Sequence, residues 1–279
     1  MVSIKISAEG TMGLFEKEKN LNKACRRELR AVAKREAAIA RAAEKSDAPW
    51  KAVLAEAVPE KVHTGLRAAF TRAFTLLFEK GTPLLDKTLD HTALSDEYRI
   101  GDYAVHLQAS RKALRRMRRD AERSGLAGSA VTTLEGIGLG ALGIGMPDIA
   151  LFLSILMRSA LSAAARWGFD GSSPGEQLLI LRMMEASLSR DADFAAANAA
   201  VNALLTAPAD PSPDEIRAQI GRTAEVFAMD MLALKFIQGL PLVGIVGGLS
   251  NPVYYNKIMR YIRLKYYKRY LLRLAAEQK

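Results

Sequence analysis

Apolar residues recur along this chain at the three- and four-residue spacing of amphipathic helices. From Leu14 to Lys45, one narrow apolar face is flanked by dense Lys, Arg and Glu. The pattern repeats from Glu60 to Glu79, until Gly81 and Pro83 interrupt it. Alternating runs of strand-forming residues are nearly absent. The pattern therefore predicts an all-α protein that forms a single multi-helix bundle.

Further helices are expected along the chain. A short helix and turn are predicted over 84–98, and a helix over 103–123. The sequences SPGE at 173–176 and SPDE at 212–215 each have the order of a capping box, with proline at the first helical position, so each predicts a helix start. The last predicted helix, 253–276, interleaves basic residues with tyrosines.

Two long apolar stretches interrupt this regular pattern. Residues 135–170 carry five glycines before Pro147, and residues 236–255 carry four glycines and two prolines. In a helix interior each glycine costs about 1 kcal/mol and each proline about 3. We therefore expect two Gly/Pro-interrupted apolar hairpins. Pro147 suits the first turn of a new helix, and Asp148 complements the dipole of that helix.

The two stretches have two interpretations. Either they are glycine-rich turns packed in a helical core, or they meet a membrane or hold an apolar ligand. Each contains a GxxxG spacing, which lets helix backbones approach closely, and we expect both stretches to lie side by side at one end of the bundle. On the second interpretation the membrane- or lipid-contacting residues are Ile137, Leu139, Leu142, Ile144, Leu242, Val243, Ile245 and Val246.

Charge is unevenly distributed along the chain. The net charge is +10, and between Asp230 and Glu277 there are eight Lys and Arg but no acidic residue. Such a segment implies an anionic partner, either lipid headgroups or nucleic acid. Packing of the last helix against the core, with its charged tips in water, explains the pattern as well. The residues expected to form a basic rim are Arg111, Arg115, Arg118, Lys257, Arg260, Lys265 and Lys268.

Motifs that resemble catalytic or metal sites lack the context that their chemistry needs. GLGALG at 138–143 matches GxGxxG, but no strand precedes it and no βαβ unit surrounds it. GSSPG at 171–175 matches GxSxG, but Pro174 has no backbone N–H for an oxyanion. His63, His91 and His106 lack metal-ligand spacing. The sequence thus favours a binding role over a catalytic one, with no cofactor and no metal.

The expected location follows from the single cysteine and the first residues. Cys25 alone cannot form a disulfide framework and fits a reducing compartment. The opening sequence has Lys5 within its only apolar run, so it does not resemble a signal peptide. We expect a cytoplasmic protein that is peripheral to the inner membrane face.

The segment PDIALFLSILMRSALSAAARWGFD at 147–170, with its preceding glycines, resembles the EcsC protein family. In this family a Gly-rich turn leads to a Pro-Asp helix that ends in an aromatic-Gly pair. The residues at the matching positions here are Pro147, Asp148, Arg158, Trp167 and Gly168, although the family more often has Tyr in place of this Trp. LPLVG at 240–244, followed by two glycines and Asn251, is similar to a later region of the family. We expect structural polar roles for Asp148, Arg158 and Asn251. The resemblance covers about 103–273 and implies an accessory role beside an ABC transporter, without catalytic residues.

The domain organisation and function can now be stated as expectations. Residues 1–13 form an irregular N-terminus, 14–102 an N-terminal helical region and 103–279 an EcsC-like helical domain continuous with it. The favoured function is non-enzymatic membrane association, or lipid or acyl-chain binding. The alternative is an interaction module that binds a transporter or another membrane protein through its apolar hairpins. Nucleic-acid binding ranks behind both, because no recognised motif accompanies the basic helix.

Overall fold

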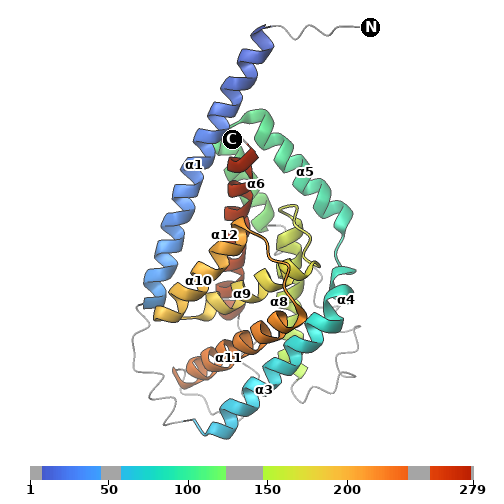
Figure 1. Ribbon diagram of the computed structural model, residues 1–279, viewed down its shortest axis with the longest axis vertical. Helices are drawn as coiled ribbons and strands as arrows, with labels where there is room; N and C mark the ends of the chain where they lie inside the picture. Colours follow the sequence, from blue (N-terminus) through green and yellow to red (C-terminus); the bar gives the residue numbers. More distant parts are fainter. Residues whose placement is uncertain (1–7, 45–57, 124–146, 238–251, 278–279) are drawn as a thin grey trace.

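A computed structural model of the protein describes residues 8–44, 58–123, 147–237 and 252–277 (Figure 1). Within these ranges the regular secondary structure is helical and no strand occurs, which confirms the all-α prediction. The eight predicted membrane- or lipid-contacting residues, in 136–146 and 238–251, lie outside the described ranges, as does the predicted contact between the two stretches.

The elements in chain order are α1 (Ala8–Glu44), α3 (Glu60–Leu76), the π-helical turn η1 (Leu77–Gly81), α4 (Thr82–Asp86), α5 (His91–Gln108), α6 (Arg111–Arg123), α8 (Pro147–Ala165), α9 (Pro174–Leu188), α10 (Asp191–Thr206), α11 (Pro213–Ile237) and α12 (Pro252–Glu277). The helix α1 already begins at Ala8, so part of the predicted irregular N-terminus is helical. None of the helices in the described ranges combines the length and the apolar character needed to span a bilayer.

The predicted helix over 103–123 is wrong, because two helices meet there. Ala109 ends α5 in the left-handed conformation, with φ 44°, and its backbone N–H donates to the carbonyl of Val105 at 2.9 Å. The hydroxyl of Ser110 then accepts a hydrogen bond from the backbone N–H of Ala113 at 3.2 Å. Left-handed alanine is uncommon, so the end of α5 has no ordinary signal in the sequence, whereas Ser110 is an ordinary N-cap residue for the start of α6.

The capping motifs form as predicted, with one difference. At the start of α11, Ser212 and Glu215 satisfy each other's backbone N–H groups at 2.8 and 3.3 Å. At the start of α9, Ser173 accepts from the N–H of Glu176 at 3.4 Å. The Glu176 carboxylate, however, turns inward, where it accepts hydrogen bonds from Tyr266 at 2.7 Å and Arg269 at 2.6 Å. It therefore joins α9 to α12 instead of completing its own cap.

The C-terminal helix α12 is the centre of the bundle. It packs against α1, α8, α9 and α10, and Figure 1 shows it running through the middle of the molecule. Tyr266, Tyr267 and Tyr270 are among the largest fully buried side chains in the described ranges. The sequence left two explanations for the pattern of this helix. The structure shows the helix packed against the core, which is the second of them.

The Trp-Gly pair after α8 fixes how this helix meets the centre. The ring centroid of Trp167 lies 5.4 Å from that of Tyr267 and 5.0 Å from that of Tyr270. Gly168 then has a φ of 71°, and a Cβ at this position would lie 2.8 Å from the ring of Tyr98. Both the left-handed backbone and the close approach of Tyr98 therefore require glycine here.

Candidate functional site

The basic residues of α6 mostly contact acidic residues of the protein itself. The side chain of Glu28 in α1 is 4% exposed and accepts hydrogen bonds from Arg111, from Arg115 at 3.0 Å and from Tyr267 at 3.0 Å. Burial alone would raise the pKa of Glu28, but these three donors outweigh it and hold the pKa below its usual value. Arg118 pairs with Glu122 on the same helix, with an N–O distance of 2.8 Å.

Lys265 lies in the interior instead of at a rim. Its side chain is 0% exposed, and its ammonium donates to Glu36 and to the side-chain carbonyls of Asn198 at 2.7 Å and Asn202 at 2.8 Å. Burial lowers the pKa of Lys265 to about 8, against the opposing effect of the Glu36 carboxylate. Lys268 contacts the same carboxylate at 2.8 Å. These two lysines hold α1 and α10 against α12.

Of the three residues predicted to have structural polar roles, the structure describes the side chain of one. Arg158 donates to the hydroxyl of Thr88 at 2.9 Å and to its backbone carbonyl at 3.1 Å, so it ties α8 to the turn between α4 and α5. The side chain of Asp148 lies outside the described part of the structure, and so does Asn251.

Lys257 and Arg260, the remaining two predicted rim residues, border a groove that we call the α1–α12 groove. Its volume is about 550 Å³, and it lies where the end of α1 meets α9, α10 and the first turns of α12. The lining residues are Ile39, Ala42, Ala43, Ser187, Ser189, Arg190, Phe194, Asn256, Lys257, Arg260 and Tyr261. Every charged residue in this lining is a cation.

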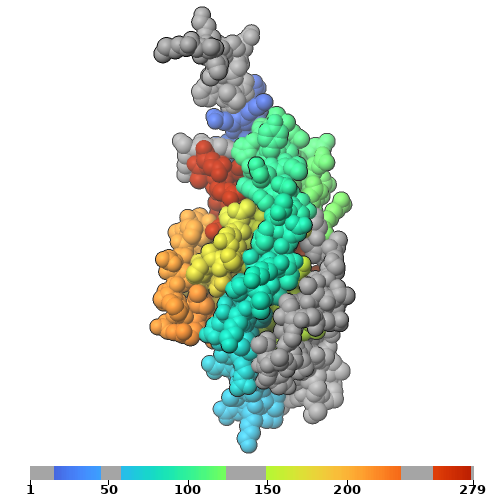
Figure 2. Space-filling view, turned by 90° about the vertical axis from the view of Figure 1, so that its right-hand side faces the viewer, coloured from blue at the N-terminus to red at the C-terminus, as the bar shows by residue number. Residues whose placement is uncertain are grey.

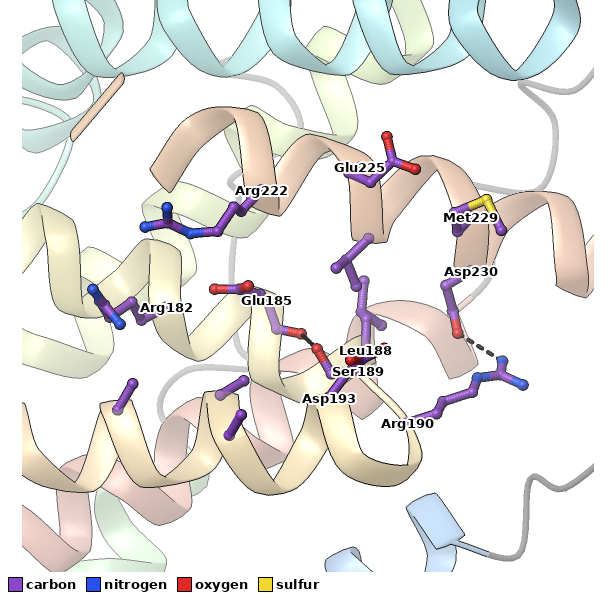
Figure 3. A pocket seen from close by; sticks show the side chains of 14 residues that line it. Arg182, Glu185, Leu188, Ser189, Arg190, Asp193, Arg222, Glu225, Met229 and Asp230 are labelled. Carbon is purple, nitrogen blue, oxygen red and sulfur yellow. Dashed lines mark hydrogen bonds and ion pairs between the residues drawn. The ribbon is translucent and has the colours of Figure 1, made fainter. Parts of the chain in front are cut away.

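A second groove, the α9–α11 groove, lies on the other side of the α9–α10 connection and has a volume of about 680 Å³ (Figure 3). Its charged lining residues are Arg182, Glu185, Arg190, Asp193, Arg222, Glu225 and Asp230. Several of these are held by neighbours: Glu185 accepts from Gln219 at 2.6 Å, and Arg222 donates to Gln219 at 2.7 Å. With carboxylates and guanidinium groups in one lining, this groove has no clear preference for an anion or a cation.

One ion-pair cluster separates the two grooves. The Asp230 side chain is 7% exposed and its Oδ1 contacts Arg190 at 2.7 Å and Lys257 at 3.4 Å (Figure 3 shows the pair with Arg190). Arg190 lines both grooves. Asp191, which follows it, has a φ of 50°, so the chain turns sharply at this corner. The predicted rim included Lys257, but nothing in the sequence pattern pointed to Arg190 or Asp230 as its neighbours.

The described helices thus define a bundle whose central basic helix is neutralised largely by carboxylates from the surrounding helices. The chain belongs to the EcsC protein family, whose sequence profile matches residues 23–271. This match confirms the resemblance and extends it beyond 103–273 to include Glu28 and Glu36, the α1 partners of α12. No curated protein matches the chain, and no solved structure does. In the described part of the chain, no group of three or more His, Cys, Asp and Glu side chains is arranged to hold a metal ion.

Proposed function

We propose that this protein binds an anionic lipid or a single acyl chain with an anionic head, as a non-enzymatic protein peripheral to the inner membrane face, and that the α1–α12 groove is the binding site. The observation that carries the proposal is the lining of this groove, which is apolar except for small polar groups and for three cations, Arg190, Lys257 and Arg260. An apolar channel with a cationic edge is complementary to an amphiphile with a negative head.

The walls suit a hydrocarbon chain. Ile39 and two alanines of α1 face Phe194 of α10 and Tyr261 of α12 across the groove. A volume of about 550 Å³ is within the range of small-ligand pockets. Each methylene group removed from water contributes about 0.8 kcal/mol, so a chain of about eight buried methylenes would supply about 6 kcal/mol before the entropy costs of binding.

The cations suit the head of such a ligand. Lys257 is half-exposed and shares the carboxylate of Asp230 with Arg190, at the longer of the two distances, 3.4 Å. Arg260, one turn further along α12, is exposed. A carboxylate or phosphate at the groove edge can therefore contact both residues, and charge-assisted hydrogen bonds of this kind are stronger than neutral ones.

The proposal is tested by two amphiphiles that differ in the charge of their heads. Dodecanoate and dodecyltrimethylammonium, each below its micellar concentration, are titrated into the full chain by calorimetry. We expect dodecanoate to bind, and the cationic amphiphile to bind about tenfold more weakly or not at all, because the groove edge repels it. Equal binding of the two amphiphiles would show that the cationic edge of the groove does not contribute to binding, and would contradict this part of the proposal.

Variants of α1 and α12 then locate the site. Ala42→Trp narrows the groove, whereas Ala38→Trp adds the same side chain at another exposed position of α1 outside the lining. Only the first is expected to abolish dodecanoate binding. Lys257→Ala combined with Arg260→Ala should weaken binding about tenfold, while Arg72→Ala with Lys87→Ala, exposed on other elements, should not. Binding unaffected by Ala42→Trp would favour a role in protein interaction instead.

A further inference from the structure

An exposed apolar ridge runs along α5. Among the described residues, the large hydrophobic side chains that remain exposed are Leu84 and three residues of α5: Ile100 at 71%, Tyr103 at 68% and Leu107 at 52%. Positions three and four residues apart share one face of a helix. This face is opposite the one that buries Leu94 and Val105. Single exposed apolar residues are ordinary, but three in register form a continuous apolar surface.

The neighbouring helix α6 places cations beside this ridge. Seven of its residues are basic and two are acidic, and Lys112, Arg116, Arg119 and Arg123 are exposed. A groove of about 640 Å³ between the two helices is lined by Ile100 as well as by Arg116 and Arg123. Its acidic lining residues are Glu97, which pairs with Arg166, and Asp120, whose Oδ2 lies 3.8 Å from the guanidinium of Arg116.

Ile100 of the ridge and Arg116 of α6 line the same groove, and on this basis we treat the ridge and the exposed cations of α6 as one surface. We call it the α5–α6 face and define it by Ile100, Tyr103, Leu107, Lys112, Arg116 and Arg119. Figure 2 shows α5 crossing the side of the molecule that faces the viewer, with α6 beside it in lighter green. The helices α5 and α6 also pack directly against each other. The face therefore presents apolar and cationic side chains together, on a part of the molecule separate from the α1–α12 groove.

We infer that the α5–α6 face docks on a bilayer surface that contains anionic lipids. This inference rests on the proposed membrane association and gives it a location. Ile100, Tyr103 and Leu107 enter the interfacial region, where tyrosine is favoured because its ring is apolar and its hydroxyl remains in contact with water. Lys112, Arg116 and Arg119 then lie at the level of the headgroups, where they attract anionic lipids.

The composition of the face favours a bilayer over other partners. A nucleic acid would be attracted by the cations of α6 but would gain little from Ile100 and Leu107, which do not stack on bases. A second copy of the chain would cover the apolar ridge but would bring two sets of α6 cations towards each other. A membrane with anionic lipids is complementary to both parts of the face.

The experiment measures sedimentation of the full chain with vesicles of phosphatidylcholine and with vesicles of phosphatidylcholine mixed with phosphatidylglycerol. The combined variant Ile100→Ser, Tyr103→Ser and Leu107→Ser removes the ridge at exposed positions, so the fold is retained. We expect its binding to the mixed vesicles to fall about tenfold or more. Leu84→Ser is the matched control, because Leu84 is exposed to 48% but lies on α4; its binding should be unchanged.

A charge-reversal pair tests the cations separately. Arg116→Glu with Arg119→Glu should lower binding to mixed vesicles about tenfold and leave the weaker binding to phosphatidylcholine unchanged. Arg72→Glu with Lys87→Glu changes the net charge equally at exposed positions of other elements. If both double variants lose binding equally, net charge alone is responsible, and the α5–α6 face is not the docking surface.

A fluorescent label reports the contact directly. Tyr103→Cys is labelled with an environment-sensitive maleimide dye and compared with Leu84→Cys. The native thiol does not compete, because Cys25 is fully buried and burial raises its pKa to about 11. We expect the emission of the dye at position 103 to shift to shorter wavelength on mixed vesicles, and the emission at position 84 to stay unchanged. Equal behaviour of the two labels would contradict docking through α5.

The outcomes separate this inference from the proposed function. If the unaltered chain binds neither kind of vesicle, membrane association and the docking face are both wrong, while dodecanoate binding can still support the α1–α12 groove. If it binds and the serine variant binds equally well, only the docking face is wrong. If the serine variant changes the elution volume on a sizing column but not vesicle binding, the ridge is a contact between copies of the chain, which also overturns the inference.

Discussion

The hydroxyl of Tyr267 donates a hydrogen bond to the carboxylate of Glu28 at 3.0 Å, and so joins the last helix of the chain to the first. Arg111 and Arg115 contact the other oxygen of the same carboxylate, so one buried side chain connects α1, α6 and α12. The α6 arginines that the sequence suggested for headgroup contact are thus held partly by an internal partner.

Glu28→Gln is predicted to lower the free energy of unfolding by about 3 kcal/mol, because it leaves two guanidinium groups without their carboxylate. The measurement is urea denaturation at neutral pH. Glu122→Gln is the control, since Glu122 is a more exposed partner on one helix and such pairs contribute less than about 1 kcal/mol. Similar losses in both variants would contradict the central role of Glu28.

The lowered pKa of Glu28 also predicts a pH dependence. A carboxyl group whose pKa is lower in the folded state binds its proton less readily there than in the unfolded chain. Its stabilisation is therefore present above the unfolded pKa and is lost as the pH falls through the folded value. Denaturation measured between neutral pH and pH about 3 should show a smaller loss of stability for Glu28→Gln than for the unaltered chain. Parallel pH profiles of the two proteins would exclude this contribution.

At alkaline pH, the buried tyrosines of α12 are predicted to destabilise the fold. Burial raises the pKa of Tyr254, Tyr261, Tyr266, Tyr267 and Tyr270. Because the unfolded chain loses these protons near pH 10 and the folded chain keeps them, stability is intact below that pH and falls above it, by about 1 kcal/mol per pH unit for each tyrosine. Lys265, whose pKa is lowered to about 8, adds stability as the pH rises from about 8 to the unfolded lysine pKa of about 10.4, and it does not change the slope above that pH.

Urea denaturation at pH 9 and pH 11 measures the alkaline effect. Tyr266→Phe removes one of the ionisable groups and should reduce the difference between the two pH values, although it also removes the hydrogen bond to Glu176. Tyr103→Phe, at an exposed position, should leave the difference as it is. Equal stability of the unaltered chain at both pH values would refute the prediction.

Two glycines are predicted to respond to alanine with opposite signs. Gly168→Ala should destabilise by about 2 kcal/mol or more, because φ is 71° and the new Cβ would lie 2.8 Å from Tyr98. Gly65→Ala lies inside α3, where nothing stands within 4 Å of a new Cβ, and should stabilise by about 0.5 to 1 kcal/mol. Thermal denaturation of both variants compares them, and a tolerated Gly168→Ala would show that the turn after α8 can relax.

The helix class and most helix starts could be predicted because they depend on local signals. The capping motifs at Ser173 and Ser212 and the proline at 147 are examples. The break at Ala109 and the alanine-rich helix α10 have weaker signals: α5 ends on a left-handed alanine with only Ser110 as a cap after it, and α10 has acidic residues in its first turn but little contrast between its apolar and polar faces. Both depend on tertiary packing that overrides local preference.

The residues of the candidate site could likewise be predicted from the sequence only in part. Lys257 and Arg260 could be chosen from the basic run of α12, but the same reasoning also selected Lys265, which is buried. Charge in sequence does not distinguish a cation that faces water from one that meets Glu36, 229 residues away along the chain. Arg190 lies in the turn after α9 and Asp230 lies in the C-terminal half of α11, and no periodicity of the sequence links these two positions.

The central place of α12 has a consequence for synthesis. This helix follows all the other described helices in chain order, so Glu28, Glu36, Asp102 and Glu176 are synthesised before the tyrosines and basic residues of α12 that they contact. Until then the helices made earlier lack the element on which their carboxylates and apolar faces converge. The bundle can therefore close only after α12 has been synthesised, and a message truncated before α12 would yield a chain that remains open to chaperones and proteases.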